Sequence, residues 1–160
     1  MELTYAPGAC NIGPDEIARR RKAAVAGLVA SIGLALALIA FGSAPGDVTR
    51  LLVALPLTGA AIGWIQARRR FCMAYGLAGT FNLGKIGEMS RVSDQAALAA
   101  DRRTALAIAA QGLALGVCGA LLFLVLPISL TNYDDDAHGD AAAADSRASS
   151  GQWTAPLPYR

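Results

Sequence analysis

Three long stretches without charge dominate the pattern of polar and apolar positions along the chain. Residues 23–42, 51–67 and 104–128 contain 20, 17 and 25 residues with no Asp, Glu, Lys, Arg or His. A helix of about 20 residues is roughly 30 Å long, which matches the hydrocarbon core of a bilayer. None of the stretches carries the polar stripe, repeating about every 3.6 residues, that a helix of a soluble bundle needs. The pattern therefore predicts an all-α membrane protein.

We expect a three-helix bundle with spans at about residues 23–42, 48–67 and 104–128, forming one membrane domain over 1–130. The composition agrees, because 54% of the 160 residues are hydrophobic and only 16% are charged. A cleaved signal peptide is the alternative for the first stretch. Its apolar region normally has about 7–15 residues, and this stretch is longer and starts late in the chain.

The cations indicate the orientation. Of the fourteen Lys and Arg residues, eleven lie in two segments, 19–22 and 68–103. The positive-inside rule then places the N-terminus and the 68–103 loop in the cytoplasm and the C-terminus outside. The preference for Arg over Lys and the abundance of Ala are typical of a high-GC bacterium, so we expect the inner membrane of a bacterial cell.

Small residues recur at four-residue spacing in all three predicted spans. Lipid removes the hydrophobic drive between helices, so close packing of small side chains has to hold them together. The residues that we expect at helix contacts are Gly27, Ser31, Gly59, Gly63, Gly112 and Gly116. These faces pack within one chain or against the helix of a partner. Pro56 predicts a kink in the second span.

The segments next to the Arg clusters are predicted to form helix starts and a membrane-surface element. Gly13 and Pro14 favour the start of the first helix, and Asp94 favours the start of the last. Residues 71–84 are uncharged but too short to span a bilayer, so we expect an interfacial or re-entrant segment there.

One candidate functional patch follows from this topology. The first two spans must be antiparallel neighbours, so their cytoplasmic ends lie about 8–10 Å apart. The polar and thiol groups that we expect to meet there are Cys10, Asn11, Cys72, Tyr75 and Asn82. Nearby arginines favour the thiolate form of a cysteine. Cys118, in the last span, reads as a small apolar filler.

No catalytic set and no metal site emerge from the residue pattern, and a cofactor stays unassigned. The tail, residues 131–160, is rich in Ala, Ser and Asp, a composition typical of disorder. Asp134, Asp136 and His138 match the first positions of a calcium-binding loop, but the closing Glu is missing, so we interpret the match as chance.

The leading functional hypothesis is a small multi-pass membrane protein with a structural or accessory role, such as that of a subunit in a larger membrane complex. Its expected partners are the lipid bilayer and other membrane subunits or further copies of the chain, with no nucleic acid. One alternative is a thiol-dependent redox or metal-handling protein that uses Cys10 and Cys72. The other is an oligomeric channel or transporter for small solutes. An enzyme is the less favoured class, because the sequence shows no catalytic set. Ionisable groups inside membrane spans mark proton and ion paths, so their absence from the predicted spans counts against a pump or a proton-coupled transporter.

The topology can be tested with reporter fusions. Reporters at residues 10 and 90 should be active in the cytoplasm, and a reporter at residue 150 should be active outside, because the charge asymmetry fixes the orientation. A reporter at residue 150 that works only in the cytoplasm would contradict the three-span topology.

Overall fold

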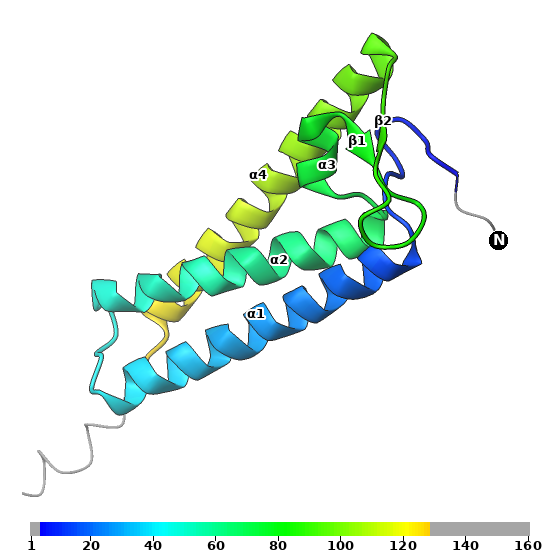
Figure 1. Cartoon of the computed structure of the whole chain (residues 1–160). Coiled ribbons are helices and arrows are strands. Elements are labelled where there is room, and N and C mark those ends of the chain that lie inside the picture. Colours follow the sequence, from blue (N-terminus) through cyan, green and yellow to red (C-terminus); the bar gives the residue numbers. More distant parts are fainter. Residues whose placement is uncertain (1–3, 129–160) are drawn as a thin grey trace, which may run out of the picture.

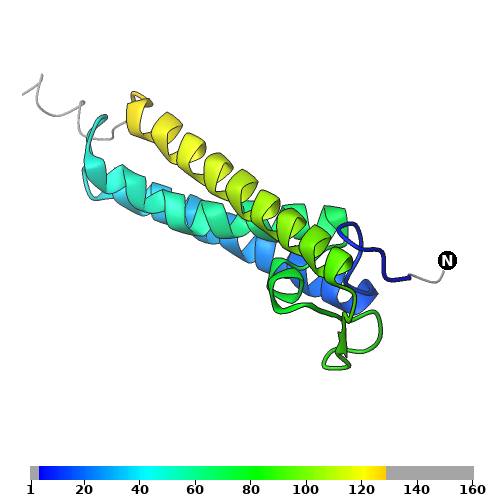
Figure 2. The same cartoon turned by 90° about the horizontal axis from the view of Figure 1, so that it is seen from above.

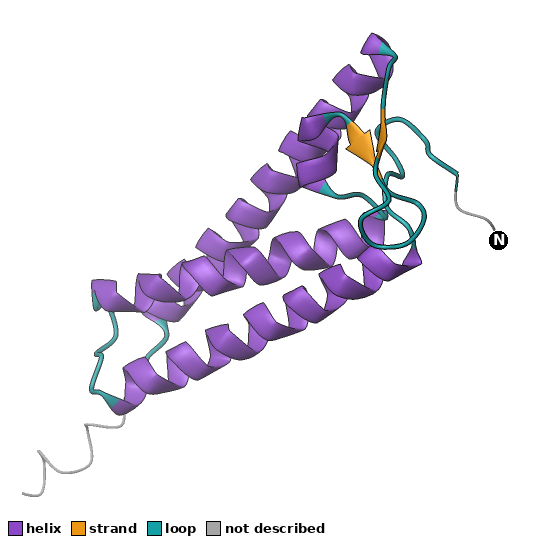
Figure 3. Ribbon diagram, in the orientation of Figure 1, coloured by secondary structure: helices purple, strands orange, loops and turns teal. Residues whose placement is uncertain are grey.

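The computed structural model describes residues 4–128, and this part of the chain is mostly helical (Figures 1 and 3). The elements in chain order are α1 (Pro14–Ala40), the 3₁₀-helix η1 (Val48–Val53), α2 (Ala54–Arg69), α3 (Met73–Ala78), β1 (Thr80–Phe81), β2 (Ser90–Arg91) and α4 (Gln95–Val125). Three segments are long and apolar enough to cross a membrane: α1, η1 with α2, and α4. The predicted tail, 131–160, with Asp134 and its neighbours, lies outside the described residues.

The three long helices are arranged around α2. Helix α2 packs against α1 on one side and against α4 on the other, whereas α1 and α4 have hardly any contact with each other. Both views show α2 antiparallel to α1 and α4, and in Figure 1 the late part of α4 crosses behind α2 (Figures 1 and 2). The predicted three-helix bundle thus has α2 as its central helix, and we call this arrangement the helix row.

The helix starts predicted from the sequence are confirmed. Helix α1 begins at Pro14, with Asp15 and Glu16 in its first turn. Asp94 caps α4, because its carboxylate accepts hydrogen bonds from the backbone N–H groups of Ala96 and Ala97. Such caps satisfy donors that the helix itself leaves unpaired.

Pro56 lies in the first turn of α2, directly after the 3₁₀-helix η1. In this position the missing N–H of proline costs no hydrogen bond inside the α-helix. The second span therefore changes from 3₁₀ to α geometry near Pro56, and the kink expected in the middle of a continuous helix is replaced by this change.

Glycines allow α2 to approach α1 at backbone distance. A Cβ atom at Gly27 would lie 3.0 Å from the backbone nitrogen of Ala60, and one at Gly63 would lie 3.2 Å from that of Ala24. Ser31 continues this buried stripe, and its hydroxyl donates to the carbonyl of Gly27 at 2.8 Å. Larger side chains at these positions would separate the two helices.

The contact between α2 and α4 is closer still. A Cβ atom at Gly116 would lie 2.8 Å from Cα of Thr58, and one at Gly112 would lie 3.2 Å from the backbone nitrogen of Ile62. Gly59 differs, because it is exposed and a Cβ atom there would meet nothing within 4 Å. Gly59 therefore makes no helix contact within the chain, and contact with the helix of a partner stays a prediction.

The first three turns of α4 extend beyond the end of α2. Gly112 of α4 lies against Ile62 of α2, and α2 ends seven residues after Ile62, so residues 95–104 of α4 continue past this end. Helix α3 packs on this extension. Phe71, at the start of the connecting segment, is fully buried. Residues 71–84, the expected interfacial or re-entrant segment, contain the short helix α3, which packs on α4, and the strand β1; their position in a membrane stays a prediction.

Arg50 closes the opposite end of the row. It is fully buried, and its guanidinium donates to the carbonyls of Ser43 at 2.7 Å, Phe123 at 3.2 Å and Leu126 at 2.8 Å. It also lies 4.9 Å from the ring centroid of Phe123. The last carbonyls of a helix have no partner inside it. Arg50 satisfies two of them at the end of α4.

Leucine substitutions at Gly116 and Gly59 should affect the stability of the fold differently. Gly116→Leu should destabilise the fold by about 3 kcal/mol or more, because the new side chain meets the backbone of α2. Gly59→Leu is the matched control, and it should leave the thermal unfolding of the detergent-solubilised monomer nearly unchanged. Equal unfolding temperatures for Gly116→Leu and the wild type would contradict this packing.

Candidate functional site

The N-terminal segment and the connection after α2 meet at one end of the helix row. We call residues 5–13 and 70–94, together with the α4 extension that they contact, the polar cap. Arg70 ends α2 with a left-handed backbone (φ 55°), and its carbonyl accepts hydrogen bonds from the N–H groups of Asn11 and Ile12. Asn82 then joins the same segment, because its N–H donates to the carbonyl of Asn11 at 2.9 Å and its carbonyl accepts from Gly13 at 2.7 Å.

The side chain of Asn11 binds the backbone of Cys72 through both of its polar atoms. Oδ1 accepts from the N–H of Cys72 at 2.6 Å, and Nδ2 donates to the carbonyl of Cys72 at 3.1 Å. Asn11, Cys72 and Asn82 are all fully buried. An amide side chain that faces a peptide group in this way reproduces the pairing of two strands, so Asn11 connects the chain before α1 to the chain after α2.

A buried carboxylate lies beside this pair. Glu16 is almost fully buried; its Oε1 accepts the hydroxyl proton of Tyr75 at 3.0 Å, and its Oε2 accepts from Arg20 at 3.5 Å. Arg20 also donates to the sulfur of Cys72 at 3.0 Å. Burial, followed by the hydrogen bond to Glu16, raises the pKa of Tyr75. The carboxylate, guanidinium, thiol and phenol therefore form one connected group.

A second buried carboxylate holds the start of the chain on α4. Asp101 is fully buried and accepts the hydroxyl proton of Tyr5 at 2.9 Å and the N–H of Gly8 at 2.6 Å. Thr104 donates to the carbonyl of Gly8 at 2.8 Å. The ring of Tyr5 stacks on Phe81, with 4.6 Å between the centroids. This contact ties residues 5–8 to both α4 and β1.

Four of the five residues predicted for the patch come together in this cap: Asn11, Cys72, Tyr75 and Asn82. Cys10 lies at its edge; it is half-buried, and its thiol faces the carbonyl of Ile12 at 4.0 Å. All three cysteines are free, and Cys118 is exposed on α4 instead of filling a packed interior. Thiol chemistry at Cys10 and Cys72 stays a prediction, and it would require the buried Cys72 to become accessible.

Sequence reasoning missed the carboxylates Glu16 and Asp101 and the phenol of Tyr5. A signal for Asp101 exists in the sequence. It shares a helix face with Ala97, Ala105 and Ile108, at spacings of four and seven residues, and these three side chains are buried. A single acid on a stripe of small and apolar residues indicates a buried, hydrogen-bonded carboxylate.

The polar groups of the cap mainly form hydrogen bonds with one another. These bonds hold chain segments together that are distant in sequence. Within residues 4–128 no group of three or more His, Cys, Asp or Glu side chains is placed to hold a metal ion. No family model, curated protein or solved structure matched this chain in the comparisons. Its function is therefore inferred from sequence and geometry.

The contribution of the Tyr5–Asp101 hydrogen bond to the stability of the fold should depend on pH. Burial first, and then the hydrogen bond to Asp101, raises the pKa of Tyr5 from 10.0 to about 12. The folded state therefore holds the phenol proton more tightly, so this contribution to stability is complete below pH 10.0 and is lost as the pH rises through about 12.

The stability difference between the wild type and Tyr5→Phe should shrink within this pH window when thermal unfolding is followed in detergent. The tyrosinate absorbance of the wild type minus that of Tyr5→Phe should titrate with a midpoint near 12. A midpoint at the value of a free tyrosine would show that the hydrogen bond to Asp101 is absent in solution.

Proposed function

We propose that this chain is an integral membrane protein with a structural or accessory role, which presents the polar cap on the cytoplasmic side of a bacterial inner membrane. The distribution of side-chain size over the three long helices carries this proposal. Large apolar side chains point outward, and Leu36, Leu55 and Val125 are 62%, 76% and 68% exposed. Small residues occupy the contacts between helices.

This distribution is the reverse of that of a soluble bundle, which buries its large apolar side chains. Apolar surfaces this extensive on a protein mark contact with lipid or with other proteins. Contacts built from Gly, Ala and Ser are typical of helices that associate inside lipid. Both observations support insertion of α1, of η1 with α2, and of α4.

The charges support the orientation. The cationic segments 19–22 and 68–70 lie at the cap end, together with the remaining basic residues of the 68–103 loop. At the opposite end Arg50 has its guanidinium engaged by carbonyls. The free positive charge of the described residues is thus concentrated at one end, as the positive-inside rule expects of the cytoplasmic side.

The structural role is supported by the way in which the polar groups of the long helices are used. Gln66 accepts a hydrogen bond from the N–H of Met73, Gln111 accepts one from Arg69, and Thr104 donates to Gly8. These contacts join helices and cap to one another. A channel or transporter needs such groups along a path for its solute, so this use of them favours a fixed scaffold.

The exposed position of Gly59 supports association with another helix. A Cβ atom there would meet nothing within 4 Å of the same chain, and an exposed glycine on a membrane helix lets the backbone of another helix approach closely. We interpret this face of α2 as a contact site for a further membrane subunit or a second copy of the chain.

Native mass spectrometry in mild detergent tests this assembly. The protein extracted from its own membrane should carry a defined partner or a second copy, and Gly59→Leu should lower the assembled fraction about tenfold, because the larger side chain separates the backbones. Gly33→Leu is the matched control, since Gly33 is also exposed with open space around it. A wild-type protein that is monomeric with no bound subunit would contradict the accessory role.

A further inference from the structure

Two grooves follow one another along the same face of the α1–α2 pair. The first, of about 790 Å³, opens at the cap end; its cationic lining consists of Arg21, Lys22, Arg68 and Arg70. The second, of about 250 Å³, lies further along both helices and is lined by apolar residues that include Val25, Leu28, Leu57, Ala61 and Trp64. We call them the basic groove and the apolar groove.

The helical spacing shows that the two grooves share one face. On α1 the lining residues Ala18, Arg21, Val25 and Leu28 follow at intervals of three and four. Residues at these intervals lie on one side of a helix. On α2 the lining residues Leu57, Ala61, Trp64 and Arg68 follow the same rule. The basic groove therefore continues into the apolar groove.

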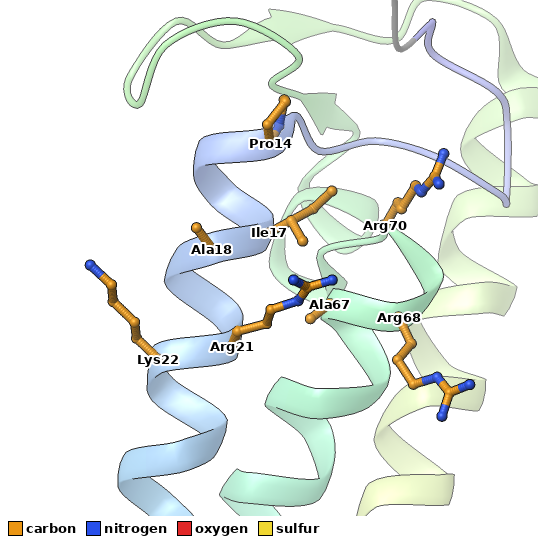
Figure 4. A pocket seen from close by; sticks show the side chains of 8 residues that line it. All are labelled: Pro14, Ile17, Ala18, Arg21, Lys22, Ala67, Arg68 and Arg70. Carbon is orange, nitrogen blue, oxygen red and sulfur yellow. The ribbon is translucent and has the colours of Figure 1, made fainter. Parts of the chain in front are cut away.

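The basic groove gathers cations over an apolar floor. Figure 4 shows the side chain of Arg21 extending between the helices toward Ala67, whereas Lys22 points away from α2 and Arg68 and Arg70 point away from α1 at the rim of the groove. Ile17 and Ala18 of α1 and Ala67 of α2 contribute apolar surface. An anion with an attached hydrocarbon part would match both kinds of surface.

These cations have no acidic partner among the described residues. The ion pairs of the described chain are those of Glu16 with Arg19 and Arg20, on another side of α1. Arg21 in the groove and the three cations at its rim together make the local potential positive, which attracts an anion. The groove thus has the charge of an anion site whose counter-charge comes from another molecule.

The position of Trp64 along the helices indicates that the anion is a lipid headgroup. Gly63 opposes Ala24 across the helix contact, so Trp64 lies near the start of the uncharged stretch of α1, one turn below Arg21. It is half-exposed. Tryptophan is enriched where the headgroup region of a membrane meets its hydrocarbon core, and basic pockets between helices at the cytoplasmic surface bind anionic headgroups.

We propose that this face binds an anionic phospholipid, with its phosphate in the basic groove and an acyl chain along the apolar groove beside Trp64. This proposal rests on the membrane insertion proposed above. The site adjoins the polar cap at Arg70, but it does not use Glu16 and Arg20, which lie on another side of α1 and bind Tyr75 and Cys72. It also differs from the Gly59 contact, because Gly59 does not line either groove.

Quenching of Trp64 fluorescence by brominated acyl chains tests the site in the full-length chain with Trp153→Phe, which leaves Trp64 as the single tryptophan. The protein is placed in phosphatidylcholine vesicles with a small fraction of phosphatidylglycerol, and bromine is carried by only one lipid at a time. The two brominated lipids are compared at the same small mole fraction. Brominated phosphatidylglycerol should occupy the site at least about fivefold better than brominated phosphatidylcholine, which is the gain expected when one cation of the protein meets a headgroup with a net negative charge.

Three charge variants make the test specific. Arg21→Gln with Arg68→Gln should reduce this preference to nearly one, whereas Arg21→Lys with Arg68→Lys should keep most of it. Arg102→Gln with Arg103→Gln is the matched control, because it removes the same charge from exposed positions of α4 outside the groove. The control should retain the preference of the parent protein.

Four results would overturn the proposal. Equal quenching by both lipids would mean that Trp64 faces bulk lipid, and an equal loss in both Gln double variants would mean that only the overall surface charge matters. Displacement of the lipid by inorganic phosphate or glycerol phosphate at similar concentration would indicate a site for a soluble anion. Absence of quenching by either lipid would indicate that protein covers this face.

Discussion

The close approach of α2 to both of its neighbours is the constraint on which the rest of the structure depends. Gly27 and Gly63 bring α1 to backbone distance, and Gly112 and Gly116 do the same for α4. Each dispersion contact is weak, and only close packing over many atoms adds up to a stable interface. Because α2 is the central helix, the loss of either interface would also separate the segments that meet at the two ends of the row.

Both ends are then closed by buried polar groups with partners distant in sequence. Removing one partner of such a buried hydrogen bond costs about 1–3 kcal/mol, because the group left behind stays desolvated. Asn11 and Asp101 close one end, and Arg50 closes the other. The small residues in the middle set the distance between the helices, and the polar groups set how the helix ends are joined. The surface that remains for lipid or partners is the outer face, with Gly59 and the two grooves on different parts of it.

Much of the helical framework could be predicted from local signals. The uncharged stretches, Pro14 at the start of α1 and Asp94 before α4 depend only on neighbouring residues, and the structure has helices at these places. The fold of residues 71–84 could not be predicted in this way. It depends on packing against the α4 extension, which lies about 25 residues further along the chain. The same reason explains why Asn11 and Asn82 were expected near each other while Asp101 was missed. Topology brought the first pair together, but the burial of Asp101 depends on residues 5–8, which carry no helical pattern.

The contacts of Arg50 have a consequence for the order in which the protein is completed. Its carbonyl acceptors in Phe123 and Leu126 lie 73 and 76 residues later in the chain. Gly8, near the other end of the row, likewise finds its carboxylate partner 93 residues later. Chains are made from the N-terminus, and early segments emerge before late ones. The first two helices therefore emerge with Arg50 bound only to the carbonyl of Ser43 and with Gly8 lacking its carboxylate partner, and α4, the last helix of the described residues, completes both sets of hydrogen bonds. A chain that stops before α4 would leave the guanidinium of Arg50 with most of its donors unpaired.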